Sequence, residues 1–157
     1  MRLEEAREIV SQEEFPQEFN PREWEAYKGA GCYPYALGIK TDEAFLIGDL
    51  IGRRMTHHNT KEEILEVLMI ELEEMGFEVL ECDTMDIAED GCFKIYLEIN
   101  QSGEYHFLRQ DSDGIWSHKA PNYLPHRKDT VGYEIIDPDS MVAPGFVGYC
   151  FLLEKAE

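Results

Sequence analysis

The sequence predicts an α+β fold in which N-terminal helices pack on an antiparallel sheet. Up to about residue 76, apolar residues recur at helical spacing, and from residue 77 onward they alternate as they do in strands. Helices first and strands later are typical of α+β proteins. A chain of 157 residues, 43% of them hydrophobic, fits a single domain with its own core. We therefore expect one domain over residues 1–157, with a helical half over about 1–76 and a sheet half over about 77–157.

The first helices are predicted from capping signals as well as from periodicity. Residues 3–14 form a predicted short acidic helix with its apolar residues on one side. Asn20 is followed by Pro21 and Glu23, which favours a helix start with Asn20 as the cap and Glu23 closing a capping box. Residues 41–55 have apolar residues at helical spacing but contain two glycines, so a helix and a turn both stay open.

The clearest helix is predicted over residues 60–75. Thr60 and Glu63 match a capping box, a broad apolar face follows them, and Gly76 suits the C-terminal end. These local signals agree with one another, so this is the helix that the sequence predicts most clearly in the helical half.

The sheet half is predicted to be built around an antiparallel meander. Residues 93–99 alternate strictly between apolar and polar, which predicts a half-buried strand. Turn signals then lead to strands over 104–110 and 115–119. Residues 146–153 are apolar on both faces, which favours a central place in the sheet. The remaining predicted strands are 77–82 and 133–136.

Cys32 lies where a short helix is predicted to begin, after the flexible segment 29–31. Pro34 is tolerated in the first turn of a helix, because its missing N–H would have no partner there. Free N–H groups and the helix dipole at such a position lower the pKa of a thiol, and the same N–H groups can hold a developing oxyanion. This is the setting of an activated nucleophile, which also needs a base. The alternative is a cysteine that packs as a small buried hydrophobe.

Two histidines in a later stretch of the chain, which begins about seventy residues further on, are candidate partners for this cysteine. His106 lies in the string YHFLRQD and His118 in the string DGIWSHK. A cysteine early on a helix, with a histidine later on a strand, is the chain order of papain-like hydrolases.

Three strings together resemble a family of small, mostly uncharacterised bacterial and phage proteins. They are CYPYAL, YHFLRQDSDGIWSHK and the closing FVGYCFL. That family is associated with a papain-like fold, akin to bacterial cell-wall cysteine peptidases. The resemblance implies that Cys32 is the nucleophile, His106 the general base and His118 the third, orienting residue. The activity it implies is hydrolysis of an amide, peptide or isopeptide bond through a thioester.

The chain departs from this pattern next to the cysteine. The pattern has Asn directly before the cysteine, whereas this chain has Gly31. Papain relatives often use an upstream Gln as the second oxyanion donor, and the nearest one here is Gln17. Two tyrosines are alternative donors, Tyr27 and Tyr33.

The face on which His118 lies depends on the preceding turn. A two-residue turn would pair His118 with Arg109, on the face opposite His106. A three-residue loop would pair it with Leu108, on the same face as His106. The first register would leave two other polar residues as third candidates, Ser117 and Asn122.

Charge limits the partners that we expect. The chain has 33 acidic and 14 basic residues and a formal net charge of −19, so nucleic acid and anionic membranes are poor direct partners. A peptide or protein substrate fits the hydrolase. The alternative function is an acidic, phage-type inhibitor that occupies a basic groove of a host defence protein, with the catalytic pair degenerate or unused. Cell-wall amidase activity is a third idea, which the absence of a signal peptide disfavours.

The sequence predicts neither a metal nor a cofactor. The cysteines 32, 82, 92 and 150 contain no CxxC pair, and His57-His58 falls in a polar loop without a third ligand at helical spacing. No apolar run approaches the roughly 20 residues that span a membrane. We therefore expect a cytoplasmic protein with reduced thiols.

Overall fold

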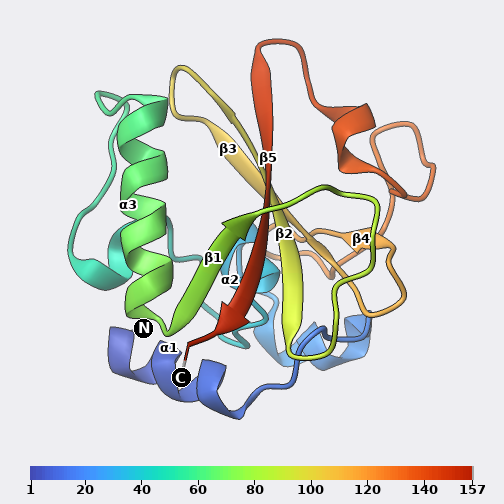
Figure 1. Ribbon diagram of the computed structural model, residues 1–157, viewed down its shortest axis with the longest axis horizontal. Helices are drawn as coiled ribbons and strands as arrows, with labels where there is room; N and C mark the ends of the chain where they lie inside the picture. Colours follow the sequence, from blue (N-terminus) through green and yellow to red (C-terminus); the bar gives the residue numbers. More distant parts are fainter. Residues whose placement is uncertain (157) are drawn as a thin grey trace.

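Three α-helices cover one face of a five-stranded antiparallel sheet in the computed structural model, which describes residues 1–156 (Figure 1). The strands lie in the order β1-β5-β2-β3-β4. The predicted α+β architecture is confirmed. The strands are β1 (Phe77–Glu81), β2 (Cys92–Asn100), β3 (Tyr105–Gln110), β4 (Trp116–Ser117) and β5 (Phe146–Lys155).

The meander β2-β3-β4 is present, and β2 is the middle strand of the sheet. The expectation that it is half-buried is wrong, because helices cover one of its faces and residues of the segment 116–142 cover the other. The strand β5 lies between β1 and β2, as its apolar faces predict. The predicted strand 133–136 does not form: within it, Glu134 and Ile135 make only isolated bridges to Lys128 and Trp116.

The helices are α1 (Leu3–Gln12), α2 (Cys32–Ala36) and α3 (Lys61–Glu74), with 3-10 turns at Pro21–Tyr27, Asp49–Ile51 and Pro138–Met141. The capping box at the start of α3 is confirmed: the Thr60 side chain accepts the N–H of Glu63, whose carboxylate accepts the N–H of Thr60.

Two of the other helix predictions change in the structure. At Asn20 the capping box is wrong, because the chain tightens into a 3-10 turn in which the Asn20 side chain makes no capping bond. The segment 41–55 contains a turn rather than a helix, since Gly48 and Gly52 both have positive φ angles, of 92° and 69°.

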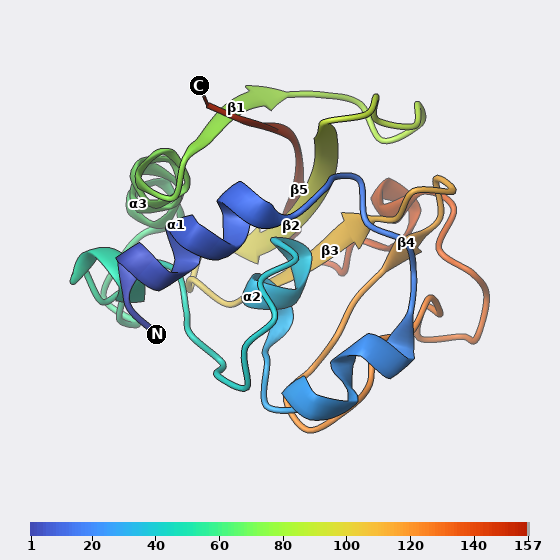
Figure 2. The ribbon, with the colours of Figure 1, turned by 90° about the horizontal axis from the view of Figure 1, so that it is seen from below.

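The main core lies between the sheet and the helices, with α2 packed directly on β3 (Figure 2). Tyr33 stacks on Phe107 with ring centroids 4.9 Å apart, and its hydroxyl donates a 2.7 Å hydrogen bond to the buried carboxylate of Glu71 on α3. These contacts hold α2 between β3 and α3. The residue that starts α2, Cys32, is therefore fixed relative to the middle of β3.

Candidate active site

The structure confirms that Cys32 is the first residue of a short helix. Gly31 is its N-cap, and the carbonyl of Gly31 accepts the N–H of Tyr35 at 3.2 Å. The backbone N–H groups of Cys32 and Tyr33 face the thiol, as the first turn of a helix leaves them free to do. The thiol is partly buried against the main core.

A buried lysine fixes the segment that leads to this cysteine. Lys119 is only 1% exposed, and its ammonium group donates to the carbonyls of Lys28, Ala30 and Ala120. It follows His118 directly in the chain. The lysine therefore ties the approach to Cys32 to the segment that carries the second histidine.

The two histidines of the predicted site are in contact. His106 lies on β3, and its Nε2 is 2.8 Å from Nδ1 of His118. The strand pair β3-β4 joins Arg109 with Ser117, which is the register of the three-residue loop. In that register His118 lies opposite Leu108 and on the face of His106.

A main-chain carbonyl determines which ring nitrogens carry protons. Nε2 of His118 is 2.9 Å from the carbonyl oxygen of Lys128, which can only accept, so Nε2 of His118 carries the hydrogen. In neutral His118, Nδ1 is then the acceptor, and Nε2–H of His106 donates to it. Neutral His106 consequently keeps the lone pair on Nδ1, where it can act as a base.

Cys32 lies against β3 at Phe107, the residue that follows this histidine. The backbone N–H of Phe107, the residue after His106, faces the thiol. The partner strand β4 ends at Ser117, opposite Arg109, so the edge of β3 is open to the thiol at Phe107. The hydrogen bonds of residues 1–156 do not include one between the thiol and His106, whose side chain lies on the sheet face away from α2. The Cys32–His106 pair stays a prediction.

Burial sets the protonation of both groups. It raises the pKa of the Cys32 thiol, and the N–H groups of Phe107, Cys32 and Tyr33 offset part of that rise. Burial, together with neighbouring His118 and His126, lowers the pKa of His106 from 6.5 to about 4. The expected net lowering of the thiol pKa at the helix start is wrong, because desolvation is larger than the effect of the N–H groups.

Several alternative site residues are engaged elsewhere. Tyr33 donates to Glu71 in the core, which removes it as an oxyanion donor. Gln17 bonds to Glu13, Arg109 and the carbonyl of Gly38. Of the alternatives to His118, Ser117 is buried against Tyr35 and Asp111, and the N–H of Asn122 donates to Lys28. Of these candidates, His118 is therefore the one whose side chain forms a hydrogen bond with His106.

Two side chains at the site were not anticipated. Glu98 is paired directly with His106 across β2 and β3, and its Oε2 is buried without a hydrogen-bond partner in the described chain. Burial raises the pKa of this carboxyl group. The hairpin signal at residues 101–103 could have placed Glu98 there, because the turn fixes the register. Lys119 gave no such signal, since a strand lysine is normally exposed.

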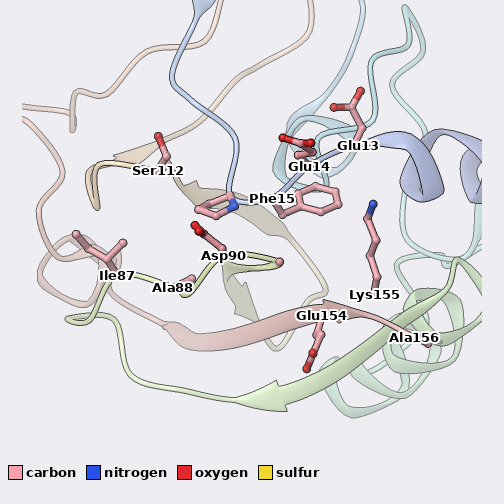
Figure 3. Close-up of a pocket in the computed structure, with 12 residues that line it drawn as sticks. Glu13, Glu14, Phe15, Ile87, Ala88, Asp90, Ser112, Glu154, Lys155 and Ala156 are labelled. Atoms are coloured by element: carbon pink, nitrogen blue, oxygen red, sulfur yellow. The ribbon is translucent and has the colours of Figure 1, made fainter.

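A large pocket lies elsewhere on the molecule. It has a volume of about 760 Å³, and Figure 3 shows Glu13, Glu14, Asp90 and Lys155 around it. The described residues that line it include no cysteine or histidine. No group of three or more His, Cys, Asp or Glu residues within 1–156 is arranged to hold a metal ion. No helix of the described chain is long and apolar enough to cross a membrane.

The fold and the site together define an α+β protein in which a hydrogen-bonded histidine pair accompanies a cysteine at a helix start. No family model matches the chain, and no solved structure matches it. Insoluble matrix shell protein 1 of Ruditapes philippinarum is 30% identical to it over 123 residues, which cover 76% of this chain and 77% of that protein. The chain belongs to the family of this shell protein.

Proposed function

We propose that the protein is a cysteine hydrolase of papain-like fold that cleaves an amide, peptide or isopeptide bond through a thioester at Cys32. The observation that carries the proposal is the chain of hydrogen bonds from the carbonyl of Lys128 through His118 to His106, which leaves Nδ1 of His106 unprotonated and able to accept a proton. That relay ends one residue from the N–H group that faces the thiol. We expect a peptide or protein substrate and a cytoplasmic setting.

The proposed reaction uses His106 first as a base and then as an acid. Nδ1 of His106 accepts the thiol proton while Sγ of Cys32 attacks the carbonyl carbon of the substrate. The N–H of Cys32 donates to the oxyanion that forms. The imidazolium then protonates the leaving amine, and a thioester remains. Water, deprotonated by His106, hydrolyses the thioester and restores the thiol, while His118 keeps the imidazole oriented.

The proton is transferred during substrate attack rather than before it. Burial raises the pKa of the Cys32 thiol and lowers the pKa of the His106 imidazole, so both groups favour their neutral forms. As Sγ bonds to the carbonyl carbon of the substrate and the thiol proton passes to His106, the π electrons of the carbonyl move to its oxygen. The sulfur is then neutral, and the negative charge lies on the oxyanion next to the helix N–H groups. The reaction therefore does not require a stable thiolate in the buried site before the substrate binds.

The test is acylation of Cys32 by p-nitrophenyl acetate, with the other three cysteines replaced by serine. We expect a burst of nitrophenolate and an acetyl adduct on Cys32, both lost in Cys32→Ala. Loss of a general base should slow acylation in His106→Ala by about 100-fold or more. His57→Ala, which removes an exposed loop histidine, should acylate like the parent. A folded parent without an adduct, or an unslowed His106→Ala, would refute the proposal.

A second candidate is a binding protein that does not use the cysteine. The net charge of −19 favours a basic protein partner, such as the nucleic-acid groove of a host defence protein. The relative is named for a place in a shell matrix rather than for a reaction, which also suits a binding role. Salt-sensitive binding that Cys32→Ala retains would support this candidate over the hydrolase.

A further inference from the structure

A pair of thiols lies on the opposite side of the sheet from α2. Sγ of Cys82 is 3.0 Å from Sγ of Cys150, and both cysteines are free and partly exposed. Cys150 packs with the cluster around Tyr96 and Trp116, whereas Cys32 packs with the helical core. This thiol pair is therefore separate from the candidate active site.

The strand register makes the two cysteines direct neighbours. β1 and β5 pair Glu81 with Phe151, and one step further the N–H of Cys82 donates to the carbonyl of Cys150 at 3.0 Å. Hydrogen-bonded neighbours in antiparallel strands have Cα atoms about 5.5 Å apart, and disulfides span Cα distances of about 4.4 to 6.8 Å. The backbone already has the separation that a disulfide between them needs.

The surroundings give the two sulfur atoms different roles. The hydrogen bond from Cys150 lowers the pKa of Cys82, with a further contribution from the Lys94 ammonium group. The same bond, with burial, raises the pKa of Cys150. Lys94 is held in place by hydrogen bonds to the carbonyls of Asp83 and Asp86. Cys82 is thus the thiol that ionises first and attacks, and Cys150 is the one that resolves.

A small reagent can approach this pair. A surface pocket of about 280 Å³ is lined by Glu81, Cys82, Gly148, Tyr149 and Cys150. At Gly148 the hydroxyl of Tyr96 occupies the space that a side chain would need, so this strand position has to be glycine.

We propose that Cys82 and Cys150 form a thiol–disulfide exchange site for low-molecular-weight disulfides such as oxidised glutathione. The Cys82 thiolate attacks one sulfur of the small disulfide, forms a mixed disulfide and releases one thiol. Cys150 loses its proton and attacks the Cys82 sulfur, which forms the Cys82–Cys150 disulfide and releases the second thiol. The protein dithiol is oxidised by two electrons, and the small disulfide is reduced to two thiols. The product links the edge strand β1 covalently to β5.

The test is exposure of the reduced full-length chain to oxidised glutathione, followed by alkylation and mass spectrometry. We expect two of the four cysteines to become protected and one cross-linked peptide pair to contain Cys82 and Cys150. Cys150→Ser should instead accumulate a glutathione adduct on Cys82, because the resolving thiol is missing. Cys92→Ser, a matched change at another partly exposed cysteine, should form the cross-link as the parent does.

Three results would overturn the proposal. The first is a parent chain that keeps all four cysteines alkylatable after exposure to oxidised glutathione. The second is a cross-link that joins other cysteines or two chains. The third is Cys150→Ser without an adduct on Cys82 although the variant is folded by circular dichroism. The hydrolase proposal is tested separately, because its assay uses a chain in which Cys82, Cys92 and Cys150 are replaced by serine.

Discussion

Acid should destabilise the folded protein through His106, and His106→Gln should remove that sensitivity. Burial lowers the pKa of this imidazole from 6.5 to about 4 in the folded chain. The unfolded chain therefore binds the proton more tightly, so the contribution of neutral His106 is complete above about pH 6.5 and is lost as the pH falls toward 4. Between about pH 8 and pH 5, linkage gives a loss of about 2 kcal/mol from this one group.

Urea unfolding followed by the fluorescence of the buried Trp24 and Trp116 measures this loss. At a slope of about 2 kcal/mol per molar urea, the parent midpoint should fall by about 1 M more than that of His106→Gln between the two pH values. Carboxylates that titrate in this range are common to both proteins and cancel in the comparison. His57→Gln, the same change at an exposed histidine, should behave like the parent.

The opposite pH dependence would refute this reasoning about the resting site. A thiolate–imidazolium ion pair would raise the pKa of folded His106, and the stability it contributes would then be present at low pH and lost as the pH rises. In that case His106→Gln would lose stability mainly at acid pH. The same titration therefore reports where the proton lies before substrate binds.

Three further substitutions test contacts that support the site. Lys119→Met leaves three main-chain carbonyls without their donor and should lower the free energy of unfolding, measured in urea, by roughly 3 kcal/mol. Lys128→Met, at an exposed side chain, should change it by no more than about 0.5 kcal/mol, and equal effects of the two substitutions would contradict the role given to buried Lys119. Thr60→Ala removes the cap of α3 and should cost about 1 kcal/mol in the same assay, and no change would mean that the box contributes nothing. Tyr33→Phe deletes one donor to Glu71 and should cost about 1 kcal/mol, with a larger loss at higher pH as the carboxylate ionises; a stabilised variant would argue against that hydrogen bond.

Local signals in the sequence predicted the parts of the fold that depend on neighbouring residues. The capping box at Thr60 and Glu63 and the helix that starts at Cys32 both follow from side chains within a few positions of each other. The antiparallel meander followed from alternation and turn residues. The contact between His106 and His118 was one of two registers that the loop allowed, and the structure has the three-residue loop.

Long-range contacts account for what the sequence did not predict. Lys119 is buried because its partners are carbonyls about ninety residues earlier in the chain, and no strand pattern encodes them. The pKa of Cys32 rises rather than falls because β3 and the core cover the thiol, which depends on the tertiary fold. At Asn20, where no capping bond forms, the chain continues as a 3-10 turn whose Trp24 is buried with Ala30 and Tyr35.

The orientation of His106 ultimately rests on an atom that every amino acid possesses. The relay begins at the carbonyl oxygen of Lys128, while the Lys128 side chain is exposed. Substituting every other amino acid at position 128 would therefore leave the carbonyl oxygen in place, and the contribution of this oxygen to the orientation of His106 would not be detected. An ester in place of the peptide bond between Lys128 and Asp129, introduced by chemical ligation, would weaken the acceptor without altering any side chain. Mutagenesis identifies the side chains on which such a protein depends, whereas a main-chain contribution is detected only when the backbone itself is altered chemically.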